Sequence, residues 1–198
     1  MKKKIFALLA IPLLTSACMP TLFLAGAAAG GAVLYDQRDP KTMLHDVQLA
    51  PQAREVFAQA KEFRGQSALQ FHSYNQNLLI TGEVSSISLQ QRVSELAHKV
   101  PLAKHIFNQT KVTAKKKDHH DLKDTWIATQ ARSLLLSKKG IRSNDFKIVA
   151  HNKIVYLMGN NNESKMHLAA GTLSKMHDVK KVVEIYNTSP KSIQKKST

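Results

Sequence analysis

The chain has 198 residues, a formal net charge of +15 and one cysteine, Cys18. A lone cysteine excludes an internal disulfide, so the fold must rest on its core and its hydrogen bonds. The excess of lysine and arginine favours an anionic partner, which such a charge attracts over a long range.

The N-terminus has the three parts of a secretory signal peptide. Lys2–Lys4 form the positive segment, Ile5–Leu14 is apolar, and the small residues Thr15–Ala17 precede Cys18. This arrangement resembles a bacterial lipobox, in which the cysteine becomes the first mature residue and receives diacylglycerol on its sulfur. We therefore expect a signal peptide over residues 1–17, covalent lipid on Cys18 and no other cofactor.

Two features of this region leave an alternative open. Thr15 stands where a lipobox usually has leucine, and residues 5–34 are mostly apolar. An uncleaved membrane helix needs about 20 such residues. Pro12 and Pro20 interrupt the run, so cleavage is the preferred interpretation. By resemblance to enterobacterial sorting rules, Met19 after the cysteine, rather than aspartate, favours the outer membrane.

The chain between residues 42 and 188 contains an internal repeat. Leu69–Gly82 and Phe146–Gly159 align without a gap at a spacing of 77 residues. Each has an alternating strand, a turn with asparagine (Asn75, Asn152) and a second apolar strand, a pattern typical of a β-hairpin. The glycine that ends each segment is interpreted as a turn position after the strand.

Helical patterns precede and follow each hairpin, and a further strand closes each copy. The predicted segments are 50–63, 86–99 and 104–112 in the first copy and 125–137, 164–176 and 180–186 in the second. Apolar residues recur three and four positions apart in the closing helices, which gives each helix one apolar face. Each copy thus predicts an α+β unit in which two helices cover a three-stranded sheet, in the order helix, strand, strand, helix, strand.

The repeated unit resembles the BON domain family, whose hairpin ends in an apolar residue, a variable residue and glycine before a helix. Leu79–Gly82 and Tyr156–Gly159 fit that pattern, and Val179–Val182 resembles the family's turn into the last strand. The first copy departs from the family at Val100–Leu102. The whole layout resembles dual BON-domain outer-membrane lipoproteins. The resemblance implies a protein that binds anionic phospholipid and supports outer-membrane integrity, often where cells divide, and it does not imply an enzyme.

The sequence therefore predicts six parts. They are a signal peptide (1–17), the lipidated cysteine with an Ala/Gly-rich tether (18–41), a first BON domain (42–113), a basic linker (114–122), a second BON domain (123–188) and a disordered basic tail (189–198). The tail is assigned to disorder because it is rich in serine, threonine and lysine. Lys115–Lys117 in the linker are interpreted as solvated.

The opening helix of the second copy has two unlike faces. At 3.6 residues per turn, Ile127, Ala131, Leu134 and Leu135 share the predicted core face. The predicted phospholipid-binding residues lie outside that face and are Lys123, Trp126, Thr129, Gln130, Arg132, Ser133 and Leu136. An outward tryptophan beside cations is typical of a membrane interface. Alternatively, Trp126 folds back over the edge of the sheet, and the residues alone do not decide between the two.

The net charge points to the same kind of partner. Removal of the signal peptide leaves 26 basic and 14 acidic side chains, a net charge of +12. Nucleic acid is the generic partner of such a charge, but an exported protein meets little of it. Anionic lipid headgroups remain, with about 1 kcal/mol from each lysine or arginine near the surface.

No residue pattern indicates chemistry. His119–Asp121 is a candidate metal cluster, but adjacent residues in a linker seldom converge on one ion. The other histidines lack the HExxH spacing of a zinc site, and no serine lies in a nucleophile elbow. We therefore expect neither catalytic nor metal-binding residues.

The sequence predicts a lipid-anchored outer-membrane protein that faces the periplasm and binds anionic phospholipid through its second BON domain. The alternative is a periplasmic adaptor that holds a protein partner, such as outer-membrane assembly machinery or the cell wall. The two differ at Trp126. An adaptor predicts a buried Trp126, or one that matters only when the partner is present.

Overall fold

The computed structural model describes residues 38–113, 122–142, 144–160, 162–186 and 191–194. The chain divides into two units, Met1–Leu34 and Tyr35–Thr198, and every described residue belongs to the second. The predicted signal peptide, Cys18, the tether up to residue 37 and the linker residues 114–121 lie outside the described residues.

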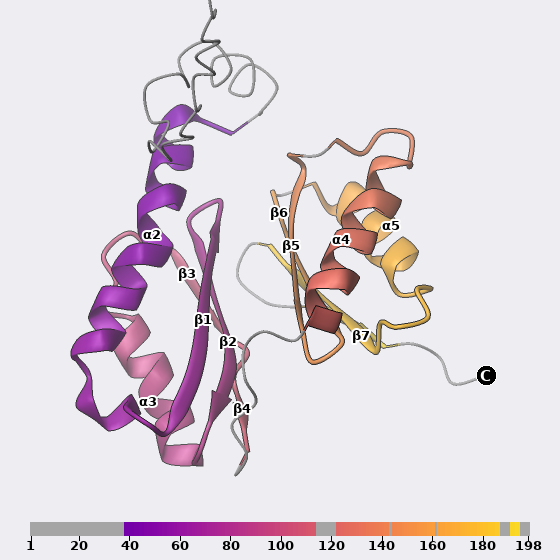
Figure 1. Cartoon of the computed structure of the whole chain (residues 1–198). Coiled ribbons are helices and arrows are strands. Elements are labelled where there is room, and N and C mark those ends of the chain that lie inside the picture. The colour runs from indigo at the N-terminus through magenta and orange to yellow at the C-terminus, as the bar shows by residue number, and fades with distance from the viewer. Residues whose placement is uncertain (1–37, 114–121, 143, 161, 187–190, 195–198) are drawn as a thin grey trace, which may run out of the picture. The chain divides into compact units, whose positions relative to one another are not determined.

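The first half of the described chain is an α+β unit built on one hairpin and one parallel crossover (Figure 1). Its elements are α2 (Pro40–Gln59), the short 3-10 helix η1 (Lys61–Phe63), β1 (Ser67–Tyr74), β2 (Asn77–Val84), α3 (Ile87–Ala97), β3 (His105–Asn108) and β4 (Lys111–Val112). β1 pairs antiparallel with β2. β3 and β4 pair parallel to β2 in one register, Ile80 with Asn108 and Glu83 with Lys111. Together they are the interrupted form of the closing strand predicted over 104–112.

The second half repeats this plan and adds a strand. Its elements are α4 (Leu122–Leu136), β5 (Phe146–His151), β6 (Ile154–Gly159), α5 (Glu163–Leu173), β7 (Lys181–Ile185) and β8 (Lys191–Gln194). The strand order is β5-β6-β7-β8, with β6 and β7 parallel and the other neighbours antiparallel. The predicted fold class is therefore confirmed, as two helix-covered sheets of the same order.

Two predicted boundaries of the opening helices were wrong. α2 begins at Pro40 rather than near residue 50, so the last two residues of the predicted tether are helical. α4 begins at Leu122, which was assigned to the linker. Proline suits a first helical turn, because its missing N–H needs no partner there. Pro51 within α2 hid the continuity of the helix, because proline normally interrupts one.

The predicted disordered tail over 189–198 was wrong for Lys191–Gln194, which form β8. This strand pairs antiparallel with β7 and places Ile193 opposite Val182. A strand at a sheet edge presents unpaired N–H and C=O groups, and a further strand satisfies them whatever its composition. The composition of this segment therefore does not predict the strand, because the unpaired backbone groups that β8 satisfies belong to β7.

Each hairpin turns through two residues with left-handed backbone, as a type I′ turn requires. These residues are Asn75, Gln76, Asn152 and Lys153, with φ of 52°, 61°, 52° and 62°. The N–H groups of the first turn donate to the carboxylate of Asp46 in α2, at 2.6 and 2.7 Å. Those of the second donate to Asp124 in α4, at 2.6 and 2.9 Å. A buried aspartate thus pins each opening helix to the tip of its hairpin.

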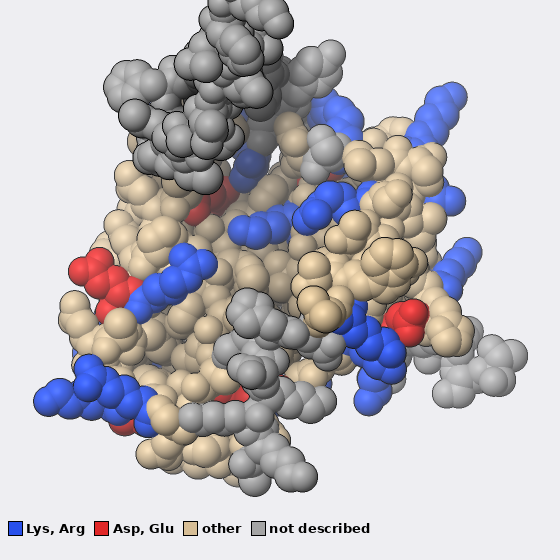
Figure 2. All heavy atoms as spheres, in the orientation of Figure 1, with Lys and Arg blue, Asp and Glu red and all other residues tan. Residues whose placement is uncertain are grey.

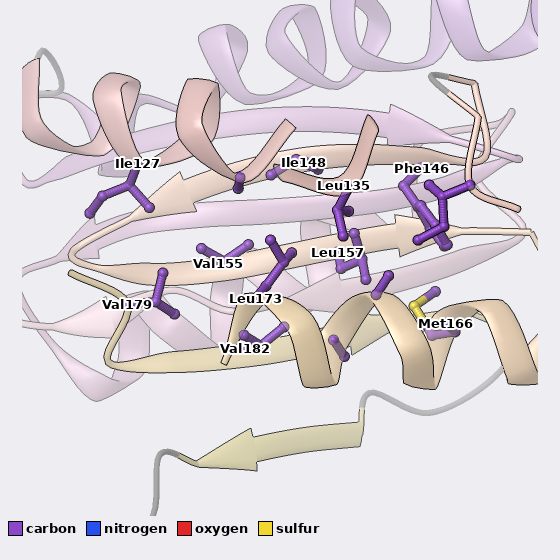
Figure 3. Packing of buried hydrophobic residues seen from close by; sticks show 14 of the residues in the cluster. Ile127, Leu135, Phe146, Ile148, Val155, Leu157, Met166, Leu173, Val179 and Val182 are labelled. Carbon is purple, nitrogen blue, oxygen red and sulfur yellow. The ribbon is translucent and has the colours of Figure 1, made fainter. Parts of the chain in front are cut away.

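One apolar core lies between the helices and the sheet in each half. In the second half, Ile127 and Leu135 of α4 and Met166 and Leu173 of α5 point onto the strands (Figure 3). In the first half, Leu49 and Phe57 of α2 hold the corresponding places, among other residues. These side chains are almost fully buried, so each half has a core of its own.

The two glycines interpreted as turn positions lie in strands instead. Gly82 is inside β2 with φ of +118°, and a Cβ there would clash with the backbone carbonyl of Ala68. Gly159 is the last residue of β6, and a Cβ there would lie 2.5 Å from the Met166 side chain. Close packing, together with a positive φ at Gly82, therefore explains both glycines.

The sheet faces turned away from the helices contribute a third apolar cluster within the unit Tyr35–Thr198. Its members are Tyr74, Leu79, Phe107, Val149, Ile154, Tyr156, Met158, Val183 and Ile185. Two polar contacts accompany it. The Tyr74 hydroxyl donates to the carbonyl of Asn144 at 2.6 Å, and the Lys147 ammonium donates to the carbonyl of Ser73 at 3.1 Å.

The aspartate contact yields a stability prediction. Asp124→Ala leaves two turn N–H groups without their acceptor, and an unsatisfied buried donor costs about 1–3 kcal/mol. We expect the free energy of unfolding, measured by urea titration with circular dichroism, to fall by about that amount. Asp39→Ala is the matched control, because Asp39 precedes α2 without making a side-chain capping bond. Equal losses in the two variants would contradict the assigned role of Asp124.

Candidate functional site

The outer face of α4 is set by the residues that anchor the helix. Ile127, Ala131 and Leu135 are buried in the second core, and Asp124 is held by the hairpin tip. These four positions fix the rotation of the helix about its axis. The opposite side must therefore face solvent, which is a property of the fold rather than of one side chain.

Three large apolar side chains are exposed on that side. Trp126 has 57% of its surface exposed, Leu136 has 50% and Leu122 has 83%. With Thr129 and Ser133 between them, these residues follow one another at intervals of three and four positions and form a single stripe. Of the two orientations considered for Trp126, the structure therefore shows the outward one.

The remaining predicted site residues lie within this stripe or beside it. Lys123, Thr129, Gln130, Arg132 and Ser133 are all exposed. At 3.6 residues per turn, Lys123 and Arg132 fall on opposite flanks of the stripe. The Lys123 ammonium lies 3.8 Å from a carboxylate oxygen of Asp178, a long and half-exposed ion pair. All seven predicted residues lie on the outer side of the helix, together with Leu122, which was not among the predicted residues.

Figure 2 shows that lysine and arginine side chains are spread over the viewed face of the molecule and that acidic side chains are fewer there. This distribution agrees with the formal net charge of +15. A basic surface of this kind strengthens contact with an anionic partner without defining its position. The place where such a partner binds must therefore be inferred from the apolar stripe on α4.

One other cluster of titratable groups lies around His167 on α5. The His167 ring contacts Glu184 at 3.2 Å and Glu163 at 3.4 Å, and the Tyr186 hydroxyl donates to Glu163 at 3.2 Å. Among the described residues, no group of three His, Cys, Asp or Glu side chains is placed to hold a metal ion. The segment His119–Asp121, where the sequence analysis expects no metal site, lies outside the described residues.

A buried polar group accompanies the apolar cluster of the two sheets. Asn152 donates to the Glu83 carboxylate at 2.8 Å, and the His151 ring lies 3.7 Å from it. His72 has a buried ring nitrogen without a hydrogen-bond partner. Burial, with Lys147 as the next largest cause, lowers the pKa of His72 from 6.5 to about 4. This histidine is neutral at physiological pH and is only partly exposed.

Comparison with known proteins now identifies the domain. Residues 123–184 match the BON domain family. The second half is a BON domain. The chain is 26% identical over 184 residues to the outer membrane lipoprotein DolP of Haemophilus influenzae, covering 93% of this chain and 95% of the relative. It is 22% identical over 152 residues to a 21 kDa hemolysin of Actinobacillus pleuropneumoniae, covering 77% and 78%.

These findings confirm a DolP-like BON-domain lipoprotein that is lipid-anchored at the outer membrane. A solved structure of CdsD, a structural protein of the type III secretion system of Chlamydia trachomatis, is 12% identical with a TM-score of 0.28, and covers 73% of this chain and 90% of its own. That likeness is too low to inform the function. Within the described residues, no helix combines the length and apolar character that crossing a membrane requires.

The BON family match covers the second half, and the structure supplies the link to the first. The same order of elements, the same type I′ turns and the same aspartate contact occur in both halves. The repeated aspartate was visible in the sequence, because Asp46 and Asp124 are separated by nearly the same interval as the hairpins. That signal would have extended the predicted opening helix of the first half back to about Asp46, although not to its observed start at Pro40.

The lowered pKa of His72 yields a pH prediction. The unfolded chain binds a proton near pH 6.5 and the folded chain only near pH 4, so the stability contribution is present above pH 6.5 and is lost as the pH falls toward 4. The loss amounts to at most about 3 kcal/mol for this shift. Urea unfolding across this range should show a steeper fall for the wild type than for His72→Gln. Parallel curves for the two proteins would contradict the assignment.

Proposed function

We propose that this outer-membrane lipoprotein binds anionic phospholipid through the outer face of α4 and in this way supports outer-membrane integrity. The observation that carries the proposal is the exposed stripe of Leu122, Trp126 and Leu136 between Lys123 and Arg132. Exposed large apolar side chains grouped on one helix face mark an interaction surface more often than scattered ones do. The flanking cations give that surface its preference for anionic headgroups.

The composition of the stripe suits a bilayer better than a rigid protein partner. The indole of Trp126 has an apolar body and one N–H donor, which matches the headgroup region. Leu122 and Leu136 lie about four turns apart at its two ends, so the helix axis would lie parallel to the membrane. Threonine and serine between them add polar groups that tolerate a wet interface.

The affinity needed from this surface is small. A lipid anchor holds the domain near the membrane, so the second contact forms at a high effective concentration. Partial burial of a few apolar side chains contributes about 1–2 kcal/mol each, and each nearby cation contributes about 1 kcal/mol. The anchor and α4 together would orient the protein on the membrane, whereas the anchor alone would leave it free to rotate.

The test compares vesicles of neutral lipid with vesicles that contain phosphatidylglycerol. Residues 36–198 should cosediment with the anionic vesicles and lose most of this binding in Trp126→Glu, because a carboxylate in the stripe meets like charge. Circular dichroism confirms folding of the variant, in which an exposed residue is changed. Added salt should weaken wild-type binding, because it screens the cations.

Gln48→Glu supplies the matched control. Gln48 occupies the position in α2 that Trp126 occupies in α4, counted from the equivalent aspartates, and it is also exposed. The Gln48→Glu substitution adds the same charge as Trp126→Glu, but to the first half of the molecule. Its binding to anionic vesicles should stay close to that of the wild type. Equal binding by wild type and Trp126→Glu, or no binding by either, would remove α4 as the lipid surface. The adaptor alternative would then be preferred.

A further inference from the structure

The first half has an open cavity between the end of α2 and the strand β1. It measures about 270 Å³. The lining residues are Arg54, Phe57, Ala58, Ala60, Phe63, Arg64, Ser67, Leu69 and Phe71. Its floor is aromatic, since the rings of Phe57 and Phe63 lie 5.4 Å apart and those of Phe57 and Phe71 lie 4.8 Å apart. Two arginines stand at its rim.

The second half has the same site in a closed form. A cavity of only about 10 Å³ is lined there by Arg132, Leu135, Leu136, Ile141, Arg142, Phe146 and Ile148. Each of these residues follows its counterpart in the first half by 77 or 78 positions, the two spacings of the repeat. Leu136 replaces Ala58, and Phe146 replaces Leu69. These two larger side chains occupy the space that the first half leaves open.

The rim arginines also differ between the halves. Arg142 lies 3.4 Å from the carboxylate of Asp145. Burial raises the pKa of Asp145, but hydrogen bonds from Lys165 and from the backbone of Arg142 outweigh it and lower the pKa overall. In the described part of the chain, neither Arg54 nor Arg64 has a carboxylate partner, and no residue from 65 to 68 is acidic. The open cavity thus joins an apolar floor to two available cations.

β1 adds a main-chain binding edge beside this cavity. It is the terminal strand of its sheet and pairs only with β2. The pair that closes a two-residue hairpin is hydrogen-bonded, so Tyr74 faces β2 and alternate residues such as Leu69 and Phe71 turn their N–H and C=O groups outward. Their side chains line the cavity. A strand added at this edge would therefore direct alternate side chains toward the same cavity.

The edge of β1 lacks the usual protection between Ser67 and Phe71, whereas further along it the Ser73 carbonyl accepts a hydrogen bond from Lys147 at 3.1 Å. Exposed edges normally carry proline, a charged side chain or a bulge. The strand Ser67–Tyr74 contains no proline, no Lys, Arg, Asp or Glu, and pairs with β2 without a bulge. In the second half, β5 carries Lys147, and β8 covers the opposite edge of the sheet.

We propose that the first half binds an extended peptide segment of a protein partner, which adds a strand to β1, places a bulky apolar side chain in the cavity and sets a carboxylate against Arg54 and Arg64. The cavity is slightly smaller than the roughly 300–1,000 Å³ of sites for drug-sized ligands, which fits one side chain better than a whole small molecule. An acyl chain would make no use of the strand edge, whereas a peptide satisfies it. The proposal is independent of lipid binding by α4.

The test uses the mature lipoprotein in nanodiscs of neutral phospholipid and a fluorescent, capped heptapeptide. Phenylalanine stands at the centre of the peptide, glutamate stands two places to either side, and threonine fills the other positions. Fluorescence anisotropy measures binding, and hydrogen exchange over residues 67–73 reports on the strand edge. We expect saturable binding at millimolar peptide or below, with slower exchange along β1.

Two variants examine the cavity and its rim. Ala58→Leu introduces the side chain that closes the second cavity and should weaken binding roughly tenfold or more, and Arg64→Glu should do the same through charge. Both residues are exposed, so the fold should persist. Gln59→Leu adds the same apolar bulk to an exposed neighbour outside the cavity and should leave the affinity unchanged. Lysine in place of the glutamates, or N-methylation of the peptide backbone, should abolish binding.

Four results would overturn the proposal. The first is no binding of the peptide at millimolar concentration. The second is undiminished binding by Ala58→Leu. The third is binding that survives N-methylation, because the edge of β1 would then not take part. The fourth is binding of dodecanoate, lost in Ala58→Leu, by a protein that does not bind the peptide, which would assign the cavity to an amphiphile.

Discussion

A buried carboxylate that joins the opening helix to the tip of the hairpin determines the geometry of each half. Two residues in left-handed conformation leave two adjacent N–H groups pointing out of each turn, and a single aspartate accepts both. The contact bridges segments about thirty residues apart, so it fixes where the helix lies along the sheet as well as how it is rotated. Apolar packing alone would permit a small slide or rotation.

The surface of α4 follows from that constraint. Once Asp124 is held at the hairpin and Leu135 in the core, the rotation of every intervening residue is set. Trp126 is then directed outward, and burial would require the loss of one of the two anchors. An exposed tryptophan is costly to keep unless it has a partner, because it leaves a large apolar surface in water. The fold therefore presents the stripe as a rigid and preformed surface.

Local patterns were sufficient to predict most of the fold. Alternation, the asparagine turns and the helical spacing identified the hairpins and four helices, and the repeat confirmed their order. Two of the failures, the start of α2 and the strand β8, depended on a partner distant in sequence. The first turns of α2 are held by the contact of Asp46 with the hairpin turn and by Leu49 in the core, and Lys191–Gln194 is a strand because β7 offers an edge. Neither partner is visible in the segment itself.

Only the part of the candidate surfaces that lies on a single helix could be predicted from the sequence. The spacing of Trp126 and Leu136 was enough to place them outward, but the cavity in the first half requires residues from α2, η1 and β1 together. The repeat shows how one position decides between two surfaces. Leucine at 136 fills the second cavity and still leaves half of its surface to extend the apolar stripe, whereas alanine at 58 leaves the first cavity open and adds little apolar surface to α2. The residue at this one position of the repeat thus extends the apolar face of α4 in the second half and leaves a pocket open in the first.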